Sequence, residues 1–250
     1  IQDEVSNFIS MLFEVYHDFG FNEIIIKFST RPDNRVGSDQ IWDKAENALE
    51  LAIEKNKLDC ELQPGEGAFY GPKIEFSLKD CIGRVWQCGT IQVDFSMPEL
   101  LGATYVDEDS SKKVPVMLHR AVVGSMERFI GILVENYAGS YPVWLAPVQV
   151  VVMSITENQT EYAKKVLNIL KNQNFRVEHD LRNETIGLKI RDHAMQRIPY
   201  QIILGPREQD KKNVAVRMRD GDDLGTMPLD DFIQRLKEDI GYLGRVDLED

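Results

Sequence analysis

The chain has 250 residues, 43% of them hydrophobic and 28% charged, a composition typical of a globular protein. Its net charge of −12 excludes nucleic-acid binding driven by bulk charge alone. No apolar run approaches the roughly 20 residues of a transmembrane helix, and no signal peptide is present, so we expect no membrane partner. The three cysteines are odd in number and lack metal-site spacing, which favours a reduced, cytoplasmic setting.

The start of the chain and its charge distribution give two further expectations. The sequence begins at Ile1, inside a helical pattern and without an initiator methionine, so we expect it to be part of a longer protein. Residues 1–145 carry 23 acidic and 13 basic side chains, whereas residues 146–250 carry 18 and 16. The second part is therefore the better candidate for contact with RNA.

The first half is predicted to be an antiparallel sheet with helices. Apolar spacing predicts a helix over 3–19 that Gly20 ends, and Ser38 is expected to cap a second helix over 39–55. Strands are expected at 23–29, 73–78 and 85–95. Because these strands follow one another through turns, we expect them to pair antiparallel.

Residues 114–137 read as a buried strand, a turn and a helix. From Met126 onward, apolar residues recur at helical spacing and form one stripe. The stripe comprises Met126, Phe129, Ile130, Leu133, Val134 and Tyr137. Arg128 lies off this stripe, on the side of Gly124 and Gly131, where small residues let a phosphate or nucleotide approach the backbone.

The pattern changes after a proline-containing break at 141–147. Strands and helices then alternate at the lengths of a small α/β domain with a mixed, mainly parallel sheet. Strands are expected at 149–153, 175–179, 200–204 and 214–218, and helices at 158–171, 186–197 and 229–240. We therefore predict a first domain over 1–142, a second over 143–245, and a tail over 246–250.

Four separated segments carry a family resemblance. Gly124 to Phe129, GSMERF, resembles motif 3 of the class II aminoacyl-tRNA synthetases. With it, the loop GEGAFYGPK at 65–73, QCGTIQVDF at 87–95 and VMLHR at 116–120 resemble the threonyl-tRNA synthetases. A glycine-rich loop alone is usually a connection, but four segments in order are far more specific. The resemblance covers both domains and implies a partial class II core followed by an anticodon-binding domain.

The resemblance implies a role for individual residues. ATP would be contacted, together with Mg²⁺, by Lys73, Gln87, Thr90, Ser125 and Arg128, of which Lys73 and Arg128 are the candidate catalytic residues. Threonine would be bound by Tyr70, Cys88, Gln92, His119 and Ala121. Strict alternation along the strand places Gln87 on the opposite face from Thr90 and Gln92, so we predict a bulge at Gly89 that brings both faces into the site.

His119 is the candidate metal ligand. From the residues alone, a histidine in an apolar strand is more often a core residue, because a zinc site needs three protein ligands. The resemblance implies one zinc ion per subunit, held by His119 and by two ligands upstream of Ile1. An open position on zinc would bind the amino group and hydroxyl of threonine, and valine lacks that hydroxyl. Serine has one, so this site alone would not exclude it.

The second domain resembles the anticodon-binding domain of the threonyl, prolyl, histidyl and glycyl enzymes. A locally positive patch is expected from Arg182, Lys189, Arg191 and Arg197. The resemblance implies that Asn183, Glu208 and Arg217 read anticodon bases, because amides and charged groups can bond unstacked bases. The alternative for Glu208 is a solvated loop charge.

The function implied is that of a threonine--tRNA ligase, a homodimeric enzyme that activates L-threonine with ATP and transfers it to tRNA(Thr). Motifs 1 and 2 of the class are not found, so the chain alone is expected to be nearly inactive, since adenylation needs electrostatic support at the α-phosphate. Two alternatives stay open. One is a prolyl- or histidyl-type enzyme, and the other is a non-catalytic RNA-binding paralogue.

Overall fold

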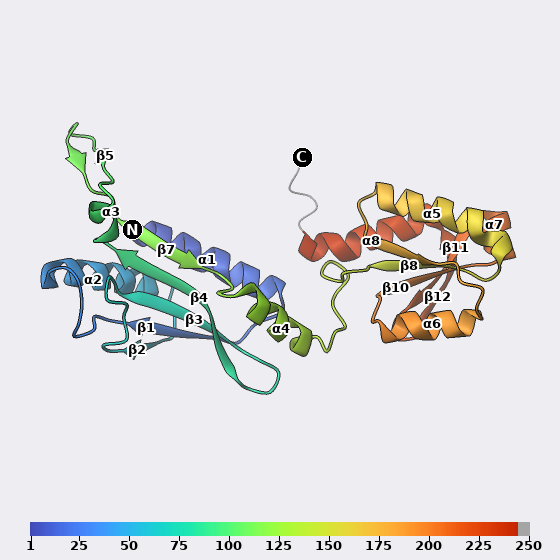
Figure 1. Cartoon of the computed structure of the whole chain (residues 1–250), viewed down its shortest axis with the longest axis horizontal. Coiled ribbons are helices and arrows are strands. Elements are labelled where there is room, and N and C mark those ends of the chain that lie inside the picture. Colours follow the sequence, from blue (N-terminus) through green and yellow to red (C-terminus); the bar gives the residue numbers. More distant parts are fainter. Residues whose placement is uncertain (245–250) are drawn as a thin grey trace. The chain divides into compact units, whose positions relative to one another are not determined.

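The computed structural model describes residues 1–244, so the predicted tail at 246–250 lies outside the described residues. The chain divides into two compact units, Ile1–Asn136 and Tyr137–Asp250 (Figure 1). Each unit is built around its own sheet and is described by itself.

The sheet of the first unit has the strand order β2-β1-β3-β4-β7. Its strands are β1 (Ile24–Ser29), β2 (Cys60–Gln63), β3 (Lys73–Lys79), β4 (Val85–Asp94) and β7 (Met117–Ala121). The pairs β1–β3, β3–β4 and β4–β7 are antiparallel, as predicted, whereas β2 joins the edge of β1 in parallel. The β2 strand was not predicted, because its four residues, CELQ, are too few for an alternating pattern to stand out.

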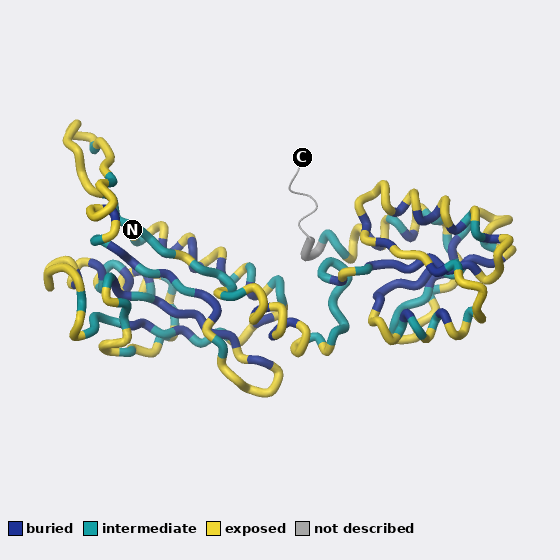
Figure 2. The backbone as a smooth tube through the Cα atoms, in the orientation of Figure 1, coloured by how far each residue is buried: buried dark blue, intermediate teal, exposed yellow. Residues whose placement is uncertain are grey.

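One face of this sheet forms the core of the unit. Ile74, Phe76 and Leu78 alternate along β3 and are fully buried. The central strands of this sheet are coloured as buried over much of their length (Figure 2). Helix α1 (Gln2–Asp18) packs on this face, where the rings of Phe8 and Phe13 meet Phe76 edge-on with centroids 6.5 and 6.2 Å apart. Helix α2 (Asp39–Lys55) lies against α1 and begins at Ser38, whose hydroxyl caps it as expected. The polar residues that alternate with the core residues therefore lie on the opposite face.

Helix α4 (Met126–Asn136) differs from its predicted apolar stripe. Its buried residues are Phe129, Ile132 and Leu133. Phe129 turns this face inward because its ring packs edge-on against Phe19, with centroids 5.0 Å apart. The other predicted stripe residues Met126, Ile130 and Val134 are exposed instead. Between β4 and β7 the chain forms a short helix α3 (Met97–Leu100) and a small hairpin of β5 (Tyr105–Val106) and β6 (Lys112–Lys113).

The sheet of the second unit is mixed and has the order β12-β11-β10-β8-β9. Its strands are β8 (Val150–Ser154), β9 (Val177–Asp180), β10 (Tyr200–Leu204), β11 (Asn213–Met218) and β12 (Asp223–Pro228). The β8 strand pairs in parallel with β9 and β10, whereas β11 pairs antiparallel with β10 and β12. The carboxyl ends of β8, β9 and β10 consequently meet at one edge of the sheet.

Helices cover both faces of this second sheet. Helix α5 (Thr160–Asn172), preceded by the turn η1 (Glu157–Gln159), and helix α8 (Leu229–Gly244) share a core with one face. Helix α6 (Ile186–Met195) packs on the other face through Ile186 and Ile190 (Figure 1). Helix α7 (Pro206–Lys211) directly follows β10. Among the described residues, no helix combines the length and the apolar character that crossing a membrane requires.

Candidate functional site

A row of predicted site residues crosses the open face of the first sheet. Lys73 in β3 is in register with Gln92 in β4, and Gln92 is in register with His119 in β7. The next row on the same face holds Thr90 and Ala121. Residues directly opposite each other in antiparallel strands share a face, so these five side chains project from one surface.

The predicted bulge brings Gln87 onto this surface. Phe76 is in register with Gly89, but the next residue, Ser77, is in register with Gln87, so Cys88 is the extra residue of β4. The prediction of a bulge is confirmed. A side chain at Gly89 would lie 2.6 Å from both the Leu12 Cδ1 and the Tyr16 Oη atoms, because α1 approaches the strand closely at this point. Gln87 consequently shares a face with Thr90 and Gln92.

The imidazole of His119 lies between an aromatic ring and a carboxylate. Its centroid is 5.3 Å from that of Tyr70, and the Tyr70 hydroxyl donates to Gln92 Oε1 at 2.8 Å. Its Nε2 lies 2.9 Å from Oδ2 of Asp94. The His119 side chain is 36% exposed, whereas that of Asp94 is 1% exposed. His119, Tyr70 and Gln92 thus form one partly exposed surface above a buried carboxyl group.

Asp94 and Glu75 are two site residues to which sequence analysis assigned no role. Asp94 follows Gln92 by two positions and therefore lies on the same face, which is the signal that could have identified it. Burial would raise the pKa of Asp94, but hydrogen bonds from His119 and from the Met97 and Ser96 amides outweigh burial and lower it. These contacts fix the carboxylate of Asp94 beneath the imidazole.

Glu75 is ion-paired with Lys73, and both side chains are mostly buried. The ammonium group of Lys73 therefore has a carboxylate partner while it faces the site. A phosphate that approaches this surface would meet a cation already held on the open face by its neighbour in β3. The pair keeps the Lys73 charge at the site without leaving it isolated in a half-buried position.

The loop that carries Tyr70 is held close to its neighbours. A side chain at Gly71 would lie 1.8 Å from the Val93 carbonyl oxygen, and one at Gly67 would lie 2.5 Å from that of Thr30. These glycines are required because other backbone atoms fill the space of a Cβ. The Val36 amide donates to the Phe69 carbonyl at 2.8 Å, so the segment 30–38 lies along this loop.

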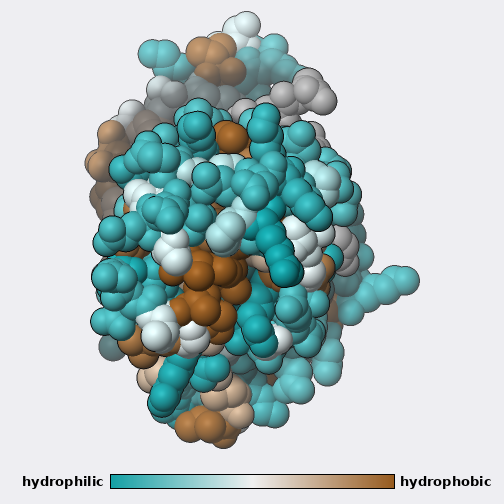
Figure 3. Space-filling model, turned by 90° about the vertical axis from the view of Figure 1, so that its right-hand side faces the viewer, coloured by the Kyte–Doolittle hydropathy of each residue, from teal (hydrophilic) through white to brown (hydrophobic). Residues whose placement is uncertain are grey.

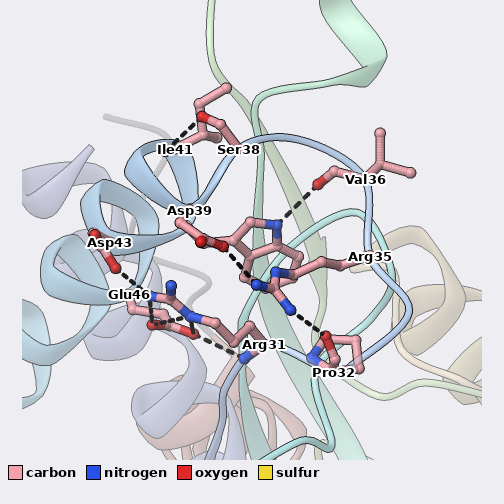
Figure 4. Close-up of polar contacts among 10 residues, drawn as sticks. Arg31, Pro32, Arg35, Val36, Ser38, Asp39, Ile41, Asp43 and Glu46 are labelled. Atoms are coloured by element: carbon pink, nitrogen blue, oxygen red, sulfur yellow. Dashed lines mark hydrogen bonds and ion pairs between the residues drawn. The ribbon is translucent and has the colours of Figure 1, made fainter.

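Charged contacts fix the segment 30–38 to helix α2 (Figure 4). The Arg31 guanidinium contacts Asp43 at 2.5 Å and makes a fork of hydrogen bonds to Glu46. Trp42, buried in α2, donates from its indole nitrogen to the Val36 carbonyl at 2.9 Å. Helix α2 thereby supports the Tyr70 loop through this segment.

Arg128 and Ser125 lie beside the two rows rather than in them. Arg128 donates to the Gln87 carbonyl at 3.2 Å, and its guanidinium lies 5.7 Å from the Trp86 ring centroid. Ser125 accepts from the Arg128 amide at 3.3 Å, at the start of α4. Cys88 is buried at the bulge, where burial raises the pKa of its thiol. Cys88 is therefore a packed residue and not a reactive thiolate.

The residues of this chain fit one ligand of a metal site. Over residues 1–244, no cluster of three or more His, Cys, Asp or Glu side chains is placed to hold a metal ion. His119 is nevertheless suited to be a single ligand, because its Nε2 is bonded to a carboxylate and its Nδ1 has no hydrogen-bond partner among the described side chains. In metalloproteins, a ligating histidine usually donates its other ring N–H to a carboxylate, a backbone carbonyl or water.

The three candidate anticodon readers lie in different parts of the second unit. Asn183 is exposed in the loop after β9, and Glu208 lies in α7 after β10, so both follow strands that end at the same edge. Arg217 lies in β11, in register with Gln201 near the start of β10, and donates to the Gly221 carbonyl at 3.0 Å. Glu208 accepts from the Gly205 amide at 2.9 Å and caps α7 with one oxygen.

A buried polar network fixes the loop that carries Asn183. Asp180, at the end of β9, accepts hydrogen bonds from Arg182 at 2.7 and 3.0 Å and lies 3.0 Å from His193 Nε2. Lys189 donates to the Ser154 and Asp180 carbonyls at 2.9 and 3.3 Å and so joins the ends of β8 and β9. Lys189 is only 1% exposed, so its predicted place in a surface-positive patch is wrong.

The end of the second unit where these strands finish is turned to the viewer in Figure 3. A hydrophobic patch lies there among hydrophilic side chains. Ile155, which directly follows β8, is exposed and lies against the position that a side chain at Gly205 would take. This edge therefore combines an apolar area with the polar groups of Asn183 and Glu208, which is the composition that unstacked bases require.

Comparison with protein families agrees with both units. Residues 1–137 match the tRNA synthetase class II core domain (G, H, P, S and T), and residues 149–239 match the anticodon binding domain. The chain therefore belongs to the family of class II tRNA synthetases. Its two units correspond to the class II core domain and to the anticodon binding domain of that family.

Within that family the similarity is to the threonine enzymes. The threonine--tRNA ligase of Alkalilimnicola ehrlichii is 61% identical over 250 residues, and that of Methylobacillus flagellatus is 62% identical over 240 residues. These matches cover 100% and 96% of this chain but only 39% and 38% of the two relatives. The chain thus spans about two fifths of their length.

A solved structure supports the same assignment. The RNA binding domain of threonyl-tRNA synthetase from Cryptosporidium parvum Iowa II is 38% identical, with a TM-score of 0.90. That match covers 95% of this chain and 60% of the solved chain. The threonyl-tRNA synthetase ThrRS-1 of Aeropyrum pernix, described as putative, has the same fold at 24% identity and a TM-score of 0.74.

Proposed function

We propose that this chain forms the threonine pocket, part of the ATP site and the anticodon-binding domain of a threonine--tRNA ligase. The complete enzyme activates L-threonine with ATP to threonyl adenylate and transfers it to tRNA(Thr). The observation that carries the proposal is the row of Lys73, Gln92 and His119 on one sheet face, with Tyr70 against the imidazole. The high identity to threonine--tRNA ligases supports the choice of amino acid.

The proposed ATP site is made by charged and polar side chains near the bulge in β4. Lys73 supplies a cation to the phosphates, with Mg²⁺ bound to the nucleotide, and exchanges Glu75 for phosphate oxygens as the nucleotide enters. Gln87 and Thr90 offer hydrogen bonds on the same face, while Ser125 and Arg128 approach from the start of α4. Arg128 already lies near an aromatic face and donates to a backbone carbonyl, which suits a planar cation beside an adenine ring.

The threonine side uses Tyr70, Gln92 and His119, with Cys88 and Ala121 as small wall residues. His119 would be one of the protein ligands of a zinc ion. When bound, zinc supplies open positions for the amino group and hydroxyl of threonine. Gln92 and Tyr70 are already hydrogen-bonded to each other and therefore present a fixed polar edge to the substrate. An analogue without the hydroxyl leaves such polar groups unpaired, which disfavours valine.

The second unit would bind tRNA(Thr) through Asn183, Glu208 and Arg217. Glu208 uses one carboxylate oxygen to cap α7 and keeps the other for a base donor. Asn183 is exposed on a loop that Asp180 and Lys189 hold in place. We also propose the domain limits 1–142 and 143–245, a cytoplasmic location and a homodimer. The free thiols of Cys60, Cys81 and Cys88 support a reducing compartment.

The test is amino-acid-dependent ATP–pyrophosphate exchange by the complete gene product. Threonine should support exchange, and Gln92→Ala should lower kcat/KM for threonine by about 100-fold, because a polar contact to the substrate is lost. Glu108→Gln, in the exposed hairpin between β5 and β6, is the matched control and should not change the rate. Exchange that depends on proline or histidine, and not on threonine, would overturn the proposal.

Zinc content gives an independent test of the same pocket. The complete gene product should contain about one zinc ion per subunit, and His119→Ala should remove it, because three protein ligands define such a site. His17→Ala, at the exposed end of α1, should keep the metal. Equal zinc content in both variants would show that His119 is not a ligand.

A further inference from the structure

The carboxylate of Asp94 is held rigidly beneath His119. Its Oδ1 accepts hydrogen bonds from the Ser96 and Met97 amides, at 2.8 and 2.9 Å. Its Oδ2 lies 2.9 Å from His119 Nε2, and the side chain is 1% exposed. Two amide donors at Oδ1 and the ring nitrogen at Oδ2 hold this buried carboxylate in place beneath the imidazole.

This arrangement determines which ring nitrogen of His119 carries the hydrogen. Because Oδ1 of Asp94 already accepts two backbone amides, Oδ2 faces the ring as a carboxylate acceptor, and Nε2 is the donor. A neutral imidazole has one N–H, and the lone pair therefore stays on Nδ1. Nδ1 is the nitrogen that has no hydrogen-bond partner among the side chains described, those of residues 1–241.

We propose that Asp94 is a positioning residue that fixes His119 as the Nε2–H tautomer and so reserves Nδ1 for a metal ion. The inference deepens the proposed function and depends on it for the identity of the ligand. The tautomer itself follows from the hydrogen bonds of the chain and can be measured without any metal.

The carboxamide variant gives a sharp prediction because the two Asp94 oxygens have different partners. In Asp94→Asn the single amide oxygen has to accept from the Ser96 and Met97 amides, as Oδ1 does in the native chain. The NH₂ group then faces His119 Nε2, which has to become the acceptor. The hydrogen moves to Nδ1, and the nitrogen reserved for the metal is blocked. In serine proteases the same carboxylate-to-amide change also produces the wrong tautomer.

The test is long-range ¹H–¹⁵N correlation spectroscopy of the ¹⁵N-labelled chain at pH 8, where imidazoles are neutral. In the native chain, His119 should show a protonated Nε2 and an unprotonated Nδ1, and in Asp94→Asn the two resonances should exchange character. Asp80→Asn is the matched control, because Asp80 also accepts backbone amides of Ile82 and Arg84 but does not touch an imidazole. It should leave the His119 resonances unchanged.

His119 can be assigned by its disappearance in His119→Gln, and thermal unfolding shows whether each variant is folded. If Asp94→Asn does not fold, the tautomer of His119 measured in the native chain tests the proposal by itself. A native Nδ1–H tautomer, or an unchanged Nε2–H tautomer in folded Asp94→Asn, overturns the proposal.

Metal binding separates this inference from the proposed function. In the complete gene product, Asp94→Asn should weaken zinc binding about 10- to 100-fold, the effect typical of losing a group that hydrogen-bonds a ligating histidine. If native His119 is the Nε2–H tautomer but the native protein contains no zinc, the proposed zinc site is contradicted. The positioning of His119 by Asp94 is not. Zinc binding that is equal in both proteins, despite a reversed tautomer, would contradict the positioning role alone.

Discussion

Each unit contains a histidine whose Nε2 meets a buried aspartate, but the two pairs have different surroundings. In the first unit His119 is 36% exposed, and Asp94 is otherwise bonded only to backbone amides. In the second unit His193 is 9% exposed, and Asp180 is also bonded to Arg182. The Nδ1 of His193 is buried without a hydrogen-bond partner among the described residues.

The difference shows why the same contact suits two purposes. An accessible imidazole with one nitrogen occupied can offer the other to a ligand. A buried imidazole whose aspartate also holds a guanidinium can only join parts of the fold, and its unpaired nitrogen costs stability. We infer that the first pair serves the pocket and the second serves the loop that carries Asn183.

The largest effect is expected from Asp180→Ala. Removing this carboxylate leaves Arg182 and the buried His193 without their acceptor, and breaking a buried ionic network of this kind costs about 3–5 kcal/mol. Urea unfolding followed by hydrogen exchange should show the loss in residues 150–204 and not in residues 24–94. Asp210→Ala, exposed on α7, is the control. Equal unfolding midpoints for both variants would refute a structural role for the Asp180 network.

Acid should weaken the second unit through the same carboxylate. Hydrogen bonds from Arg182, together with His193, hold the pKa of Asp180 below its usual range despite burial. Because the folded pKa is below the unfolded value of about 4, this stabilisation is present above about pH 4 and is lost as the pH falls towards the folded pKa. Asp180→Asn should flatten this dependence. An identical slope of unfolding free energy against pH in both proteins would exclude Asp180 as its source.

A smaller loss of stability is expected when the loop that carries Tyr70, next to the His119–Asp94 pair, is disturbed. Gly71→Ala places a methyl group 1.8 Å from the Val93 carbonyl oxygen, so the Tyr70 loop has to shift, at a cost of about 1–3 kcal/mol. The variant should alter the NMR signals of His119 and leave those of His193 unchanged. Gly131→Ala is the matched control, because nothing lies within 4 Å of its added methyl group.

Helix propensity should make Gly131→Ala more stable by about 0.5–1 kcal/mol. If Gly71→Ala behaves in the same way, the close approach of the loop to β4 does not constrain Tyr70.

Much of the first unit could be predicted from the sequence because its signals are local. The alternation along β3 and the Ser38 cap predicted the observed elements, and Gly89 predicted the bulge that places Gln87 in the site. The spacing of Asp94 from Gln92 indicates the face on which Asp94 lies, but not its role, because that role depends on His119 in β7, which is distant in sequence. The face of α4 was misjudged for the same reason, since Phe19 decides which apolar residues are buried.

In the second unit, charge type misled the prediction. Lysine is usually exposed, so Lys189 was assigned to a surface patch. Only the tertiary fold shows that the ends of β8 and β9 offer it two carbonyl acceptors. Helix α7 and strand β12 were also missed, because PREQDK and DLGTMP are short and lack a clear apolar period.

The smallest effect on stability is expected from substitution of His119. It directly tests the difference between the His119–Asp94 and His193–Asp180 pairs. His193→Ala removes a buried partner of Asp180 and should cost about 1–3 kcal/mol. His119→Ala should change stability by about 0.5 kcal/mol or less, because Asp94 keeps its two backbone donors and water can reach the vacated site. Denaturant titration of the two variants measures the contrast.

His119→Gln completes the test, because its amide can donate to Asp94 but offers no imidazole nitrogen to a metal. The variant should match the native chain in stability and still lose zinc in the complete gene product. If His119→Ala is as destabilising as His193→Ala, the first pair also holds the fold together. Its exposure would then not indicate a role in ligand binding.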